Sequence, residues 1–260
     1  MGFASVHGDD RDTRRSDSSP SSSLPTSKLL AKTFGYMALA LFLTAGVAVG
    51  LGYGLEAWLG RVDISRQVET NVLIVYLIAL IVSFIGCLIL GFVMRKVLAS
   101  GRHSIWVPYL LYAGLMGVML STLVFICEPW VLAEALGIAS IVFLAMFLIG
   151  YFSKINLNPL GMVALGLLFA VLLLSLFWVL FYFLLTPGQY FVFDLVVSLI
   201  LVGVLLIIAA VDAYNIKSIL ASGDANNNVC LYCAFIMYSD FVVILVRIVY
   251  LLSLLKGGRK

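Results

Sequence analysis

Two acidic residues stand inside otherwise apolar stretches near the end of this chain. Asp212 precedes the short polar turn 223–228, and Asp240 follows it. Two helices joined by so short a turn run antiparallel. At about 1.5 Å rise per residue, the two carboxyl groups then differ in depth by roughly 6 Å, so they share one level of a helix bundle.

This pair of acids has two interpretations. In the structural one, Asp240 is a polar group that joins two helices through a hydrogen bond. In the functional one, the two acids act as a unit, because two carboxyl groups in a site of low dielectric do not both ionise easily and tend to share one proton. Such a pair switches between a protonated, closed contact and a charged state that repels or binds a cation.

Two arginines are candidate partners of these acids. Arg95 ends an apolar stretch that our topology brings to the same side of the membrane as Asp212, so the two meet if their helices are neighbours. Arg247 follows Asp240 by seven residues, two helical turns, and lies on the same helix face. We expect Arg247 to neutralise Asp240 or a different carboxylate in the core.

Two further acids lie close to the ends of apolar stretches. Glu134 falls in the first turn of its helix, where the helix dipole favours a negative charge; a role in an ion path is the alternative. Asp194 opens another stretch beside a loop, and we expect it to be solvated at the membrane interface.

The elements that must position these residues are membrane-spanning helices. The chain is 63% hydrophobic and 11% charged, whereas a soluble domain has about 25% charged residues. The formal charge of +3 and the absence of a basic stripe with aromatic residues give no indication of nucleic-acid binding. We therefore predict an all-α membrane protein that packs against the lipid bilayer.

Seven apolar stretches are long enough to cross a hydrocarbon core, which takes about 20 residues. They predict a bundle of about seven transmembrane helices over residues 29–260, after a disordered polar tail, residues 1–28, that lacks core-forming side chains. The predicted spans are Thr33–Trp58, Asn71–Val97, Ile105–Cys127, Val131–Tyr151, Leu160–Leu185, Phe191–Tyr214 and Val229–Leu255.

Glycines at every fourth position of the first span, Gly46, Gly50 and Gly54, predict a ridge on which another helix packs closely. We expect the same of Gly114 and Gly117 in the third span, and of Ala133 and Gly137 in the fourth.

Basic residues predict an orientation with the N-terminus inside. Ten then lie on the inner side: Arg11, Arg14, Arg15, Lys28, Lys32, Arg95, Lys96, Arg102, Lys154 and Lys217. Five lie outside: Arg61, Arg66, Lys256, Arg259 and Lys260.

The last two spans carry a recognisable pattern. The stretch Asp212-Ala-Tyr-Asn-Ile-Lys217, the short turn, and Tyr238-Ser-Asp240-Phe-Val-Val-Ile-Leu-Val-Arg247 resemble the transmembrane Bax inhibitor motif family, as does the basic helix end Met94-Arg95-Lys96. The resemblance covers about residues 29–260. It implies a calcium leak channel or a regulator of ion homeostasis, in which Asp212 and Asp240 form a di-aspartyl pH sensor and Arg95 pairs with Asp212.

The same resemblance makes Ca²⁺ the expected transported ion, with Asp212 and Asp240 as its candidate ligands, and implies no resident cofactor. It implies the cell (inner) membrane if the chain is bacterial and an organelle membrane otherwise.

Two other functional classes compete with the channel. A non-conducting membrane protein that binds proteases or channels is the alternative. An intramembrane aspartyl protease also places two acids on neighbouring helices, but its Gly-x-Gly-Asp motif is missing before both Asp212 and Asp240. We therefore do not expect an enzyme.

The predicted orientation is testable at the turn between the last two spans. A cysteine introduced at Asn226 should react with a membrane-impermeant thiol reagent only from the side that holds the N-terminus. Labelling from the opposite side would overturn the topology.

Overall fold

The computed structural model describes residues 26–59, 66–100, 104–177, 187–221 and 226–257. These ranges form seven helices and contain no strand, which confirms the predicted all-α fold. The helices are α1 (Thr26–Leu59), α2 (Arg66–Ser100), α3 (Trp106–Ile126), α4 (Pro129–Phe152), α5 (Asn158–Leu176), α7 (Pro187–Ala221) and α8 (Asn227–Gly257).

Six of the described helices are long and apolar enough to cross a membrane. Each coincides with a predicted span; α3 is one residue shorter at each end, and the other five extend beyond their predicted bounds by one to seven residues. The apolar part of α5 is shorter, Asn158–Leu174, and the end of the fifth predicted span beyond residue 177 lies outside the described residues. The predicted tail also lies outside them up to residue 25.

The outer surface of the bundle is apolar. Val75 and Phe92 on α2, and Met162 and Val163 on α5, expose most of their side chains. A soluble protein of this size does not leave such large apolar faces open to water, whereas a bilayer covers them. The chain is therefore an integral, multi-pass membrane protein.

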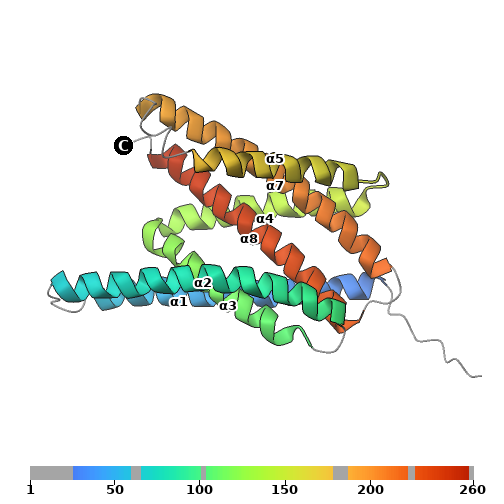
Figure 1. Ribbon diagram of the computed structural model, residues 1–260, viewed down its shortest axis with the longest axis horizontal. Coiled ribbons are helices and arrows are strands. Elements are labelled where there is room, and N and C mark those ends of the chain that lie inside the picture. The colour runs from blue at the N-terminus through green and yellow to red at the C-terminus, as the bar shows by residue number, and fades with distance from the viewer. Residues whose placement is uncertain (1–25, 60–65, 101–103, 178–186, 222–225, 258–260) are drawn as a thin grey trace, which may run out of the picture.

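Helix α8 lies at the centre of the bundle (Figure 1). It contacts α1, α4 and α7 along much of its length. In its apolar segment, 56% of the residues are buried inside the protein, against 17–28% in the other five candidate spans. α3 packs on α1 and carries α2 on its outside, while α5 packs on the outside of α7. Two groups of helices thus flank α8, with α1, α2 and α3 on one side and α4, α5 and α7 on the other.

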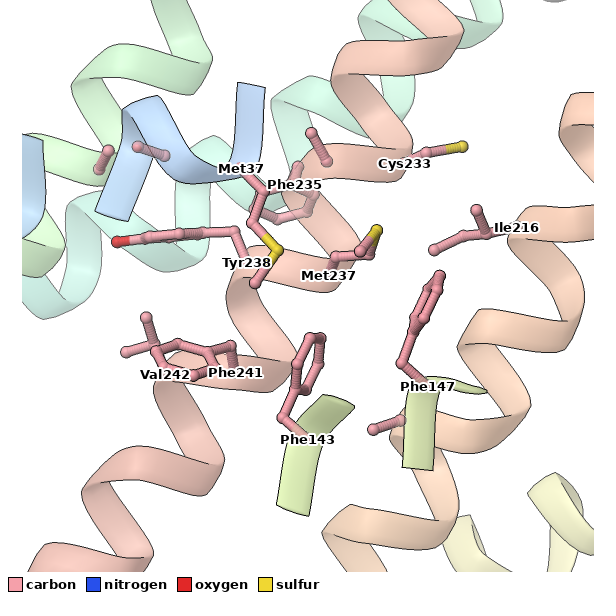
Figure 2. Close-up of a cluster of buried hydrophobic side chains, with 14 of the residues drawn as sticks. Met37, Phe143, Phe147, Ile216, Cys233, Phe235, Met237, Tyr238, Phe241 and Val242 are labelled. Carbon is pink, nitrogen blue, oxygen red and sulfur yellow. The ribbon is translucent and has the colours of Figure 1, made fainter. Parts of the chain in front are cut away.

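Side chains of α8 point into both groups (Figure 2). Phe241 meets Phe143 of α4 edge to face, with ring centroids 5.5 Å apart, and Tyr238, fully buried, points toward α1. Aromatic pairs of this geometry stabilise a core beyond the area that they bury. α8 is therefore fixed from two sides by large side chains.

One predicted packing surface is wrong. A Cβ added at Gly46, Gly50 or Gly54 would meet nothing within 4 Å. The helix uses the opposite face, where a second set of small residues repeats every four positions and is buried: Ala40, Thr44, Ala48 and Gly52. Since the two sets are offset by two residues, about 200° around the helix, spacing alone does not choose between them.

Between α1 and α3, the glycines that permit close approach are Gly52 and Gly117. A Cβ at Gly117 would lie 2.9 Å from the carbonyl oxygen of Thr44, and one at Gly52 would lie 2.7 Å from Val124 Cγ1. α1 and α3 therefore pack nearly backbone to backbone. The predictions for Gly114 and Gly137 are wrong, since both positions are open.

The start of α8 lies at the same end of the bundle as the start of α1. Lys32 donates a hydrogen bond to Asn227 Oδ1 at 2.6 Å, and the Ile105 amide, just before α3, donates to Asn228 Oδ1 at 3.5 Å. Asn226 caps α8, because its side-chain oxygen accepts the Val229 amide at 3.0 Å. We call this end, which the basic residues predict to be cytosolic, the inner end.

A buried hydrogen bond joins α8 to the α1–α3 pair. Thr44 Oγ1 donates to the Ala113 carbonyl at 3.0 Å, so its hydrogen is used, and the Tyr238 hydroxyl, 2.6 Å away, is the donor to Thr44. Three helices thus meet at one hydroxyl.

Replacing Tyr238 with Phe should lower the melting temperature of the detergent-solubilised protein. A net hydrogen bond is worth about 1 kcal/mol, which corresponds to about 2–4 °C in a chain of this size. Tyr53→Phe is the matched control, because Tyr53 is 44% exposed. Equal melting temperatures for the two variants would contradict the proposed three-helix junction.

Candidate functional site

The structure brings Asp212 of α7 and Asp240 of α8 together. Their carboxyl groups are close enough to act on each other electrostatically, and both side chains are partly shielded from the surface. A hydrogen bond between two carboxyl groups requires a proton on one of them, because an ionised carboxylate only accepts. A proton on either acid would therefore let the two groups bond to each other between α7 and α8.

Arg95 lies near this pair. Its guanidinium is close enough to Asp212 to act on it electrostatically, while its side chain is exposed at the inner end of α2. An arginine that reaches a carboxylate from the membrane surface keeps its charge in water. Asp212 thus has two alternative partners, a second carboxyl group and a cation.

Asp240 is held by its own helix. Tyr238 and Asp240, two residues apart, point to nearly opposite faces of α8. The Tyr238 face is bonded to α1 through Thr44, and the other face carries Asp240 toward α7. The Tyr238–Thr44 hydrogen bond on the opposite face of α8 therefore fixes the position of the helix segment that carries Asp240.

Asp212 is held by two glycines of neighbouring helices. A Cβ added at Gly150 of α4 would lie 2.0 Å from the carbonyl oxygen of Ala210, and one at Gly161 of α5 would lie 2.9 Å from Val211 Cγ1. These contacts fall on the two residues that precede Asp212. α4 and α5 thus set the position of α7 at the acid pair.

Arg247 lies beside a different carboxylate. It lines a cavity of about 250 Å³ together with Asp194 and Tyr250, at the end of the bundle opposite the turn. Asp194 is only 8% exposed and accepts a hydrogen bond from the Tyr250 hydroxyl at 2.6 Å. The expectation that Asp194 is solvated at the interface is wrong.

Glu134 is ion-paired with Lys256. The distance between Glu134 Oε2 and Lys256 Nζ is 2.5 Å, and the side chains are 38% and 41% exposed. The pair ties the start of α4 to the end of α8. The alternative that Glu134 contributes to an ion path stays a prediction.

The described residues contain no group of three or more His, Cys, Asp or Glu side chains that could hold a metal ion. Asp212 and Asp240 together supply at most four carboxylate oxygens, whereas Ca²⁺ takes six to eight ligands. A cation at this pair would keep several waters.

A helical bundle with six long apolar helices and an apolar outer surface defines a multi-pass membrane protein. The chain matches the family model described as inhibitor of apoptosis-promoting Bax1 over residues 26–258. It belongs to the Bax inhibitor family. No curated protein and no solved structure gives a match.

Three features of the site were not found from the sequence: the Thr44–Tyr238 hydrogen bond, the Gly150 and Gly161 contacts, and the Tyr250 partner of Asp194. Tyr250 gave a weak signal, because it follows Arg247 by three residues and shares its face of α8. The glycine contacts gave none, since α4 and α5 each hold other glycines that face open space.

The Gly150→Ala variant should displace α7 at Ala210 and so disturb the acid pair. Inserting a methyl group into a packed site costs about 1–3 kcal/mol, and this one would meet backbone rather than a side chain. We expect a lower melting temperature and an altered pH dependence of whatever activity the acid pair controls. Gly137→Ala on the same helix is the control, because its Cβ meets nothing within 4 Å. Similar behaviour of both variants would refute the role of Gly150.

Proposed function

We propose that this chain is a leak path for cations, with Ca²⁺ as the transported ion, and that proton exchange at Asp212 and Asp240 gates it. The observation that carries the proposal is the closeness of the Asp212 and Asp240 carboxyl groups between α7 and α8. Ionisable groups inside a membrane protein are costly and usually serve an ion or proton path.

The chemistry of the pair supports two states. With one shared proton, the carboxyl groups bond to each other and hold α7 against α8. Without it, two negative charges face each other at short range, and this repulsion needs relief. The relief comes from pairing Asp212 with Arg95, from a bound cation or from separation of the helices, and each of these changes the α7–α8 contact.

The packing supports α7 as the element that moves. α8 is held by the Tyr238 hydrogen bond to α1 and by aromatic contacts to α4. α7 has α5 on its outside and contacts α4 where Gly150 meets Ala210. In our proposal, this glycine contact is the pivot about which α7 tilts when the acid pair loses its proton.

The acid pair is not suited to peptide hydrolysis in our reading. The Gly-x-Gly-Asp motif of intramembrane aspartyl proteases is missing at both positions. A role in proton exchange needs no such backbone turn. The oxygen atoms of the pair, completed by water, provide transient ligands for a hard cation.

The Asp240→Asn variant should lose the pH dependence of Ca²⁺ flux through purified protein in liposomes. The asparagine amide donates a hydrogen bond to Asp212 at every pH, so the variant should keep the flux that wild type shows at its acid limit. Asp240→Ala removes the bond and should keep the flux of the alkaline limit. These two substitutions at one position therefore bracket the wild-type profile.

The control for this experiment is Glu128→Gln, which removes an exposed carboxylate ahead of α4 and should leave the profile intact. The double variant Asp212→Asn, Asp240→Asn should add little to either single one. Additive, independent effects would mean that the carboxyl groups are not coupled. Absence of any flux in wild type would favour the non-conducting membrane regulator.

A further inference from the structure

A second polar group of residues lies on the same α7–α8 seam as the acid pair. On α7, Asp194 and Asp212 are eighteen residues apart, five full turns, and so share one face. On α8, Arg247 follows Asp240 by two turns on one face. The seam therefore carries carboxylates at both of its ends, about 27 Å apart along α7.

The cavity at the far end of the seam is large enough for water. Its volume is about 250 Å³, and one water takes about 30 Å³ in the liquid. Four polar side chains line it, Asp194 and Ser198 from α7 and Arg247 and Tyr250 from α8, among apolar residues of α5 and α7. Water or a hydrated ion at this place would meet oxygen atoms of three side chains.

Asp194 has polar neighbours inside the protein. Asp194 is only 8% exposed, and its carboxylate accepts a hydrogen bond from the Tyr250 hydroxyl. Arg247 lines the same cavity and acts electrostatically on Tyr250. A buried carboxylate with a neighbouring arginine is a site where an incoming cation competes with a built-in one.

We propose that Asp194, Ser198 and Tyr250 form a second cation site at the outer end of the α7–α8 seam, and that Arg247 is the charge that a bound divalent cation displaces. Asp194 provides the carboxylate, and the two hydroxyl oxygens and water complete the shell. The inference rests on the proposed function only in naming the conducted ion as the ligand. Binding at this cavity is measurable without any flux.

Terbium luminescence tests this site directly. Tb³⁺ replaces Ca²⁺ at oxygen ligands and emits when a tyrosine within a few ångströms is excited, and Tyr250 stands 2.6 Å from the Asp194 carboxylate. In uncharged detergent, wild type should give saturable emission that Ca²⁺ suppresses. Asp194→Asn should weaken Tb³⁺ binding about tenfold or more, and Tyr250→Phe should remove most of the emission.

Arg247→Gln keeps the carboxylate and tests the competing charge. It should tighten Tb³⁺ binding about fivefold or more, since a like charge next to the ion is removed. Glu128→Gln, an exposed acid ahead of α4, is the matched control and should bind as wild type does. If Asp194→Asn does not fold, as judged by gel filtration and melting, Arg247→Gln and Tyr250→Phe decide alone.

Emission that persists unchanged in Asp194→Asn, or affinity that stays unchanged in Arg247→Gln, would overturn the second site. A proteoliposome assay separates this failure from failure of the proposed function. Intact pH-dependent flux with no Tb³⁺ site at Asp194 refutes the inference alone. Tb³⁺ binding at Asp194 in a protein that conducts no Ca²⁺ refutes the proposed function alone.

Discussion

A bilayer offers no hydrogen bonds to a polar group, and this constraint decides where α8 lies. The helix carries Tyr238, Asp240, Arg247 and Tyr250 between its ends, and none of these is tolerated against lipid. Each therefore needs a partner from another helix. Thr44 serves Tyr238, Asp212 serves Asp240, and Asp194 serves Tyr250 and shares a cavity with Arg247. A helix with polar groups on several faces is satisfied only at the centre, and α8 occupies that place (Figure 1).

The partners on the two sides of α8 differ in kind. Toward α1, the Tyr238 hydroxyl bonds to a threonine whose own hydrogen is already used, and no step of this contact depends on pH in the physiological range. Toward α7, α8 presents Asp240 to a second titratable group, Asp212. In the proposed function, the contact with α1 is therefore permanent and the contact with α7 depends on a proton. This asymmetry is the reason why the proposal assigns the motion to α7 rather than to α1 or α8.

The sequence predicted the helices and the acid pair because both follow from one-dimensional rules. Hydropathy located the spans, and equal distance from a short turn placed Asp212 beside Asp240. The packing face of α1 was predicted wrongly, because small residues repeat every fourth position on two opposite faces and only the Thr44 hydrogen bond to α3 distinguishes them. The burial of Asp194 was missed for a related reason. A carboxylate near a helix end is solvated unless another helix covers it, and the cover is Tyr250, fifty-six residues later.

The residues between the two carboxylate sites bear on how such a seam would stay closed to ions. Leu201, Val204 and Ala209 of α7 lie between Asp194 and Asp212 and are buried. An apolar stretch between two polar, hydrated places excludes an ion without a plug, since the ion would lose its water there. In the proposed path, loss of the proton from the acid pair therefore needs to separate α7 from α8 along this stretch only enough to admit water. A small tilt of α7 about the Gly150 contact acts on the whole stretch at once, because helices α7 and α8 are each continuous across it.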